Sequence, residues 1–223
     1  VNPHGSGRKQ LTDNVSLEDT RPAWSPLGNK IAFVRQDADV YVMNTDGTAP
    51  TRLTATTSAE GRPQWSADGR KVEFSSSRDG NEEIYVMNAD GTGVLRLTNQ
   101  AGTDTWPSWS PHGTRILFTS TRDGNQEIYV MNADGAGVTR LTNHAANDTW
   151  AMWSPNGSRV AFQANRDGTS NDVYVMNPDG SNVIRLTTNS AVDQMPAWSP
   201  DSRRIAFMST RDGNAEIYTM NAD

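Results

Sequence analysis

One motif recurs along the chain at a nearly constant interval, and it constrains the fold more than any other feature of the sequence. Its most complete copy, residues 119–135, reads TSTRDGNQEIYVMNADG. The tyrosines at the centre of its five copies lie 44 or 45 residues apart, at Tyr41, Tyr85, Tyr129, Tyr174 and Tyr218. A fixed period in the low forties is typical of repeat architectures, in which each unit buries its apolar surface against its neighbours. The sequence therefore predicts five similar structural units.

Each copy reads as four short strands. A tryptophan strand, a phenylalanine strand, the tyrosine strand and an Arg-Leu-Thr strand such as residues 94–98 follow one another. The tyrosine strand is rich in β-branched and aromatic residues, and Asn-Ala-Asp-Gly supplies the turn of a hairpin. No long segment has helical spacing. Four antiparallel strands per repeat form one propeller blade, so we predict an all-β, five-bladed β-propeller with its tryptophan, phenylalanine and tyrosine columns packed between blades.

The predicted propeller is a single domain over residues 1–223, with blades at 13–54, 55–98, 99–142, 143–187, and 188–223 plus 1–12. Residues 1–12 match residues 176–187 position by position, so they have the sequence of a fourth strand. The last repeat has no fourth strand of its own. Because unpaired sheet edges promote aggregation, we expect the N-terminal strand to pair with the C-terminal blade and to close the ring within a monomer.

Charge and composition exclude several classes of function. The formal net charge is -6, whereas nucleic acids and anionic membranes bind clustered Lys and Arg. We therefore expect no nucleic-acid binding. No apolar run is long enough for a transmembrane helix, and we expect no membrane insertion. The sequence has no cysteine, which excludes disulfides and thiolate metal sites. The common hydrolase, zinc-protease and phosphate-loop motifs are also absent.

The repeat consensus contains Asp-x-x-Pro-x-Trp-Ser-Pro-x-Gly, Ile-Ala-Phe, Ser-x-Arg-Asp-Gly-Asn-x-Glu-Ile-Tyr-Val-Met-Asn-Ala-Asp-Gly-Thr and Arg-Leu-Thr. It resembles the TolB-type β-propeller repeat over essentially the whole chain. The resemblance implies a WD-like propeller with the tryptophan on the innermost strand and a periplasmic or secreted location. It also implies a protein partner, since the family's namesake binds a peptidoglycan-associated lipoprotein over one channel mouth. That protein has six blades and a separate N-terminal domain, whereas this sequence has five repeats.

An acidic residue precedes each repeat tryptophan by five positions: Asp19, Glu60, Asp104, Asp148 and Asp193. In a propeller these positions enter the innermost strand, so a ring of carboxylates would face the channel mouth. Such a ring could hold a metal, and oxygen ligands suit a calcium ion, although no cofactor is required. The alternative, which we favour, is that each carboxylate pairs with the arginine of an Arg-Asp-Gly loop. The first repeat lacks that loop, and Asp19 is therefore expected to have no partner.

Differences between repeats indicate where a binding site lies, because a feature that every blade needs serves packing. Three residues before the repeat tryptophan, two repeats have Trp106 and Trp150, where the others have Arg21, Arg62 and Met195. Adjacent aromatics could form a platform for a peptide, a sugar or a partner's side chain, or could cover the channel by packing on neighbouring loops. His144 and Asn147 lie in the same link as Trp150. The predicted ligand-binding residues are Trp106, Trp150, His144, Asn147, Arg21 and Arg62.

These observations favour a non-catalytic binding module that presents the Arg-Asp-Gly face, around the channel mouth, to a protein or small ligand. One alternative is a metal-dependent propeller hydrolase or lyase that uses Asp19, Asp104, Asp148 and Asp193 around a cation. Another is a structural repeat unit or an engineered propeller, because the second to fifth repeats are very similar.

Overall fold

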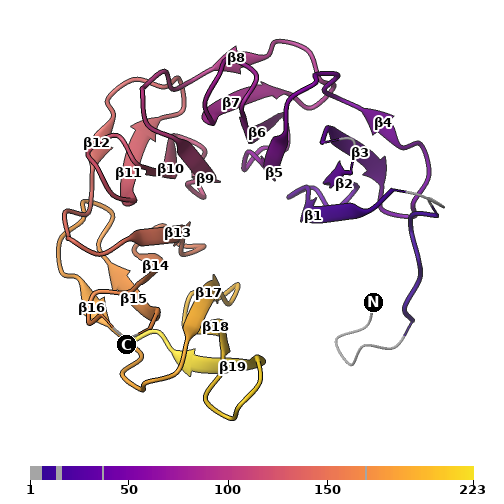
Figure 1. Ribbon diagram of the computed structural model, residues 1–223. Coiled ribbons are helices and arrows are strands. Elements are labelled where there is room, and N and C mark those ends of the chain that lie inside the picture. The colour runs from indigo at the N-terminus through magenta and orange to yellow at the C-terminus, as the bar shows by residue number, and fades with distance from the viewer. Residues whose placement is uncertain (1–6, 14–16, 37, 169) are drawn as a thin grey trace.

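The computed structural model describes residues 7–13, 17–36, 38–168 and 170–223, and its strands there form five antiparallel sheets. The sheets follow one another around a central axis (Figure 1). They have the strand orders β1-β2-β3-β4, β5-β6-β7-β8, β9-β10-β11-β12, β13-β14-β15-β16 and β17-β18-β19. No helix that could cross a membrane occurs in these ranges. The structure confirms the predicted all-β propeller with five blades.

The strands occupy equivalent positions in every blade. The innermost strands are β1 (Asp19–Trp24), β5 (Glu60–Trp65), β9 (Asp104–Trp109), β13 (Asp148–Trp153) and β17 (Asp193–Trp198). The second strands are β2 (Lys30–Arg35), β6 (Lys71–Ser76), β10 (Arg115–Ser120), β14 (Val160–Ala164) and β18 (Arg204–Ser209). The third strands are β3 (Val40–Asn44), β7 (Glu83–Asn88), β11 (Glu127–Asn132), β15 (Asp172–Met176) and β19 (Glu216–Asn221). The fourth strands are β4 (Thr51–Arg52), β8 (Leu95–Arg96), β12 (Thr139–Arg140) and β16 (Ile184–Arg185).

The core lies between blades, as the repeated aromatic columns predict. Phe118 pairs with Tyr129 across β10 and β11, and the ring centres lie 5.6 Å apart. Each blade repeats this pair at 5.4–5.9 Å. The apolar cluster between the first two blades combines Ala23 and Val40 with Trp65 and other residues of the second blade. Each blade therefore completes the core of its neighbour.

The fourth strands are shorter than the predicted five-residue strand 94–98. In the second blade the threonine that ends the Arg-Leu-Thr motif leaves the backbone ladder, and its side chain takes over. The Thr98 hydroxyl accepts a hydrogen bond from the backbone N–H of Ile84 at 2.9 Å and donates one to the buried Glu83 carboxylate. Threonines at the same position of the first, third and fourth blades make the same bond to the third strand. A side-chain bond thus replaces one rung of the sheet.

The predicted pairing of the N-terminal strand with the C-terminal blade is wrong for the residues that can be compared. Residues 1–6 lie outside the described residues, and residues 7–12 form no strand beside β19. Instead, Leu11 packs against the cluster of Ile31, Phe33 and Met43 in the first blade, and Lys9 donates to the Asp46 carbonyl at 2.8 Å. Figure 1 shows the reason: the arc of blades leaves the fifth blade apart from the first. Apolar contact keeps this segment on the first blade.

The open arc also exposes residues that are core in the other blades. Trp65 and Trp153 are 8% and 9% exposed because each packs on the preceding blade, whereas Trp24 is 63% exposed. On the fifth blade Ile217 is 75% exposed, while its counterpart Ile128 is fully buried against the following blade. The expectation that every column is core therefore fails at the two blades that flank the opening.

Candidate functional site

Each Arg-Asp-Gly loop is held by an ion pair between its arginine and the acid that begins the innermost strand. Arg122 Nη2 lies 2.7 Å from Asp104 Oδ2, and its guanidinium carbon lies 4.8 Å from the centre of the Tyr129 ring. The same pair joins Arg78 to Glu60, Arg166 to Asp148 and Arg211 to Asp193, at 2.6–3.3 Å. The favoured interpretation of the acid ring is confirmed. These arginines neutralise buried carboxylates and cover the aromatic pair.

The first blade makes the same ion pair from a different position, so the expectation that Asp19 has no partner is wrong. Arg35 ends β2 directly opposite Asp19, and its Nε lies 2.8 Å from Asp19 Oδ1. Its guanidinium carbon lies 4.5 Å from the centre of the Tyr41 ring. Because the loop after β2 is short, the arginine that a loop supplies elsewhere comes here from the strand itself.

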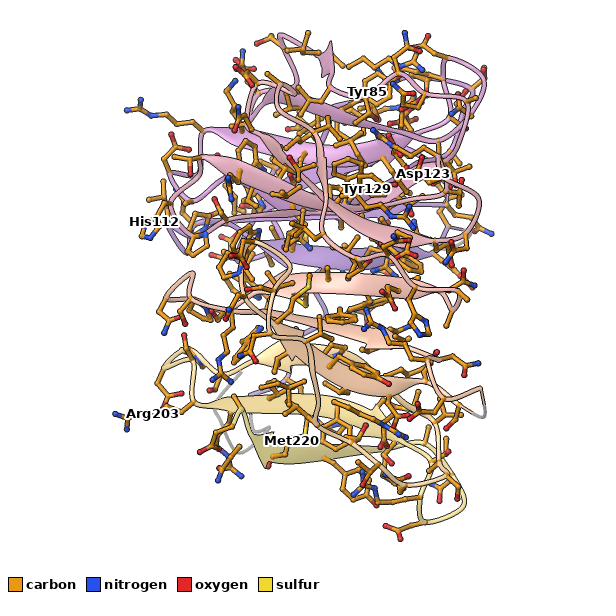
Figure 2. The ribbon with its side chains drawn as sticks, turned by 90° about the vertical axis from the view of Figure 1, so that its left-hand side faces the viewer. Tyr85, His112, Asp123, Tyr129, Arg203 and Met220 are labelled. Atoms are coloured by element: carbon orange, nitrogen blue, oxygen red, sulfur yellow. The ribbon has the colours of Figure 1, made fainter. Side chains whose placement is uncertain are left out.

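The aspartate of each Arg-Asp-Gly loop is engaged as well. In the second blade the Tyr85 hydroxyl donates to Asp79 Oδ2 at 2.5 Å, and Arg96 Nη1 lies 3.6 Å from the same carboxylate oxygen. Burial and the bond to Asp79 raise the pKa of the Tyr85 hydroxyl. In Figure 2 the equivalent Asp123 lies toward one edge of the stack of blades, and His112 and Arg203 lie toward the opposite edge. The charges on the Arg-Asp-Gly face therefore mainly satisfy one another.

The structure does not bring the five acids together into a metal site. Among the described residues, no group of three or more His, Cys, Asp or Glu side chains could hold a metal ion. Burial raises the pKa of Glu60, Asp104 and Asp148, while hydrogen bonds and the paired arginines act in the opposite direction. Two carboxylate oxygens, Glu60 Oε2 and Asp104 Oδ1, are buried without a hydrogen-bond partner, but they belong to different blades.

The channel is lined by residues that adopt an uncommon backbone conformation. In each innermost strand the pairing with the second strand is interrupted by a bulge. The residue three positions before the tryptophan has a left-handed φ in all five blades: Arg21 (54°), Arg62 (48°), Trp106 (52°), Trp150 (58°) and Met195 (57°). Large side chains rarely adopt this conformation, and bulges commonly redirect a side chain beside a functional site. The fold thus holds five large side chains at one level of the channel.

Four of these five side chains meet at one cavity. A space of about 260 Å³ is lined by Arg21, Arg62, Trp106 and Trp150, together with their neighbours on β1, β5, β9 and β13. The Trp106 and Trp150 rings lie 5.5 Å apart with an interplanar angle of 56°. The Arg62 guanidinium carbon lies 3.7 Å from the centre of the Trp150 ring and 5.1 Å from that of Trp106. Arg62 belongs to the second blade and Trp150 to the fourth, so this contact extends past the third blade.

Both arginines of the cavity lack the carboxylate partner that the loop arginines have. Among the ion pairs of the described residues, none includes Arg21 or Arg62. Burial and the nearby positive charge of Arg21 lower the pKa of Arg62 to about 10. Arg62 is therefore still a cation at neutral pH, and the aromatic faces are its main stabilising contacts. The cavity combines positive charge with apolar walls.

His144 and Asn147 do not line this cavity. The His144 backbone N–H donates to Glu127 at 2.7 Å, and its Nδ1 accepts from the Ala146 N–H. Asn147 Oδ1 accepts from the Gln126 N–H at 3.0 Å. Both residues fix the link between the third and fourth blades. The lining also includes Gln64, Ser108 and Met152, which are not among the predicted ligand-binding residues. They all directly precede a repeat tryptophan, a position that also varies between repeats and lies on the same strand face as the bulge residue.

Solved structures with the same architecture include proteins of more than one function. TolB from Acinetobacter baumannii superimposes with a TM-score of 0.81 at 27% identity, covering 92% of this chain and 52% of that protein. A structure assigned to TolB from Agrobacterium tumefaciens superimposes with a TM-score of 0.82 at 23% identity, covering 92% of this chain and 77% of that protein. An oligogalacturonate lyase in complex with manganese superimposes with a TM-score of 0.72 at 16% identity, covering 94% of this chain and 66% of that protein. The last two similarities show a shared fold, and the chain spans about half the length of the Acinetobacter protein.

The sequence itself assigns the family. It matches the TolB beta propeller domain over residues 2–100, 96–183 and 151–223, which overlap and together cover nearly the whole chain. The match agrees with the five sheets, the tryptophan on each innermost strand and the repeated ion pairs. This chain belongs to the TolB β-propeller domain family.

Proposed function

We propose that this chain is a non-catalytic binding module that takes a segment of a protein partner, or a small ligand, at the mouth of its central channel. The observation that carries the proposal is the cavity lined by Arg21, Arg62, Trp106 and Trp150. At this level the blades differ in sequence, while the second to fifth repeats are otherwise very similar. Buried aromatic and arginine side chains are the residues that most often dominate binding energy at interfaces. TolB-like propellers generally bind protein partners, which supports the same role here.

The alternative function, a metal-dependent hydrolase or lyase, has less support. It needs acids that are free to hold a cation, and all five candidate acids form ion pairs with arginines. The likeness to the manganese-bound lyase concerns the fold alone, at 16% identity. An assay of the purified protein with a panel of hydrolase and polyuronide-lyase substrates, with and without EDTA, distinguishes the two functions. Turnover that EDTA abolishes would favour the enzyme.

The family resemblance supports a periplasmic or secreted location for this binding. Fractionation of cells that express the complete natural gene tests it. Recovery of the protein only in the cytoplasmic fraction would contradict this part of the proposal.

The binding proposal is tested by selecting peptides from a phage-displayed library against the protein. The selected peptides are then measured on a variant with Trp106→Met and Trp150→Met. Methionine is suitable because Met195 has the same left-handed conformation in the fifth blade. We expect the variant to bind at least about tenfold more weakly, since it lacks both aromatic anchors.

Trp24→Met is the matched control. Trp24 is 63% exposed and does not line the cavity, so its replacement should leave binding unchanged. Selected peptides that bind the double variant as tightly as the natural protein would refute a site at the channel mouth.

A further inference from the structure

We propose that the cavity formed by Arg21, Arg62, Trp106 and Trp150 is a carboxylate-binding site that accepts an aspartate or glutamate side chain of a peptide partner. The inference rests on the proposed function and specifies the chemistry of the same site. It follows from the charge balance, the orientation of the groups and the size of the cavity.

The charge balance of the channel leaves the arginines of this cavity without a counter-charge. Each arginine that covers a Phe–Tyr pair has its own acid at 2.6–3.3 Å. The cavity instead holds two arginines on adjacent blades, and no acid is among its lining residues. Arg21 Nη1 would lie 3.2 Å from a Cβ at Gly61, the residue before Arg62, so the Arg21 guanidinium reaches the backbone beside Arg62. Arg62 is half-buried and Arg21 is exposed, and two like charges close together are unfavourable until an anion joins them.

The nearest acids along the chain cannot supply this anion. Asp19 lies two residues before Arg21 but pairs with Arg35, and Glu60 lies two residues before Arg62 but pairs with Arg78. Glu60 also accepts from the hydroxyls of Thr56 and Ser76. These two acids are therefore committed within their own blades, and among the described residues no acid lines the cavity, so we take the anion to come from a partner.

The orientation of the groups favours a planar anion. The Arg62 guanidinium carbon lies over the indole rings, 3.7 Å from the centre of Trp150 and 5.1 Å from that of Trp106. A cation–π contact leaves the N–H groups of a guanidinium available as donors, and these groups match the two oxygens of a carboxylate. Pro22, Pro107 and Met152 make part of the wall apolar, and a charged hydrogen bond is stronger beside such a wall than in bulk water.

The size of the cavity favours a side chain over a large ligand. Its volume of about 260 Å³ lies below the range of typical sites for drug-sized molecules, which begins at about 300 Å³. An acidic side chain with part of its backbone fills such a space, and the rest of a peptide can lie on the surrounding channel mouth. The cavity is thus suited to anchor one acidic residue.

The test uses the indole N–H signals of Trp106 and Trp150 in nuclear magnetic resonance spectra, assigned with the Trp→Met variants. N-acetyl-glutamate N-methylamide is the probe, and the matching glutamine compound is its neutral counterpart. We expect the glutamate probe to shift both indole signals and the glutamine probe to bind at least about tenfold more weakly. Sodium chloride should weaken the binding of the glutamate probe and leave the binding of the glutamine probe unchanged.

Three variants separate charge from shape. Arg62→Met should abolish the response, and Arg62→Lys should restore only part of it because lysine lacks the planar fork. Arg203→Gln removes an exposed arginine that does not line the cavity and lies on the edge opposite Asp123 (Figure 2), and it should change nothing. Equal responses to the glutamate and glutamine probes would overturn the carboxylate assignment and leave the binding function intact. A larger response to inorganic phosphate would overturn the assignment to a carboxylate.

The failure of the proposed function gives a different result. If the glutamate probe shifts the two indole signals but no selected peptide depends on Trp106 and Trp150, the anion site stands and peptide binding fails. If selected peptides depend on both tryptophans but need no acidic residue, peptide binding stands and the carboxylate inference fails.

Discussion

Glu73 is a buried acid in a position that other blades fill with an apolar residue. It is fully buried on β6, where the equivalent residue of β10 is Leu117. The backbone N–H of Trp109 lies near enough to oppose the pKa shift slightly, but neither carboxylate oxygen accepts a well-formed hydrogen bond. Burial raises the pKa of Glu73 well above 4.5. Burial therefore favours the neutral form of this carboxyl in the core between the second and third blades.

Glu73→Leu should stabilise the protein, and the gain should grow with pH. An unsatisfied buried polar group costs about 1–3 kcal/mol, which corresponds to about 2–12 °C in Tm for a chain of this size. Between the ordinary pKa of 4.5 and the raised folded-state pKa, the folded protein keeps a proton that the unfolded chain has released. The contribution of Glu73 to the stability of the natural protein therefore falls by about 1.4 kcal/mol per pH unit in this window. The leucine variant lacks this loss.

The measurement is urea unfolding, followed by tryptophan fluorescence, of both proteins at pH 5, 6, 7 and 8. The difference between them isolates Glu73, because all other titrating groups are shared. The reciprocal change Leu117→Glu in the third blade should lower stability and add a pH dependence of the same sign. A difference between Glu73→Leu and the natural protein that is constant with pH, or a less stable leucine variant, would refute the reasoning.

Three further outcomes are expected. Arg122→Ala should lower the free energy of unfolding by about 3–5 kcal/mol in urea at pH 7, because it leaves the fully buried Asp104 carboxylate without its counter-charge. A decrease of less than about 1 kcal/mol would mean that the ion pair does not stabilise the fold. Gly91→Ala should lower Tm more than Gly80→Ala. Both glycines have a positive φ, but only at Gly91 would a Cβ lie 3.0 Å from the Leu53 carbonyl oxygen. Equal decreases in Tm would contradict this close approach. Millimolar calcium should leave Tm unchanged because the ring acids are already paired, and a rise of several degrees would support a channel calcium site.

The blade fold could be predicted from the sequence because it depends on local, repeated features. The Asp-Gly turns, the Phe–Tyr pairs and the loop arginines recur at fixed spacing, and each makes the same contact in its blade. The opening of the ring could not be predicted. It depends on the angle between neighbouring blades, which adds up over the whole chain, and Leu11 therefore stays on the first blade.

The candidate site was only partly predictable for a related reason. Trp106, Trp150, Arg21 and Arg62 were identified because they break the repeat at one position, and the structure brings all four together. His144 is close to Trp150 in sequence, but its hydrogen bonds fix the link to the third blade. Arg35 was missed as the partner of Asp19 because it lies outside the repeated Arg-Asp-Gly motif, and only the strand register places it opposite the acid.

The sequence by itself determined the number of blades, the order of strands within each blade and the ion pairs of the four Arg-Asp-Gly loops, because these features join residues close in the chain. Only the tertiary structure decided which side chains meet across the channel. Arg62 reaches Trp150 because left-handed bulges on separate blades place both side chains at one level. Sequence spacing carries no information about a contact of this kind, since it depends on how whole blades are arranged around the axis.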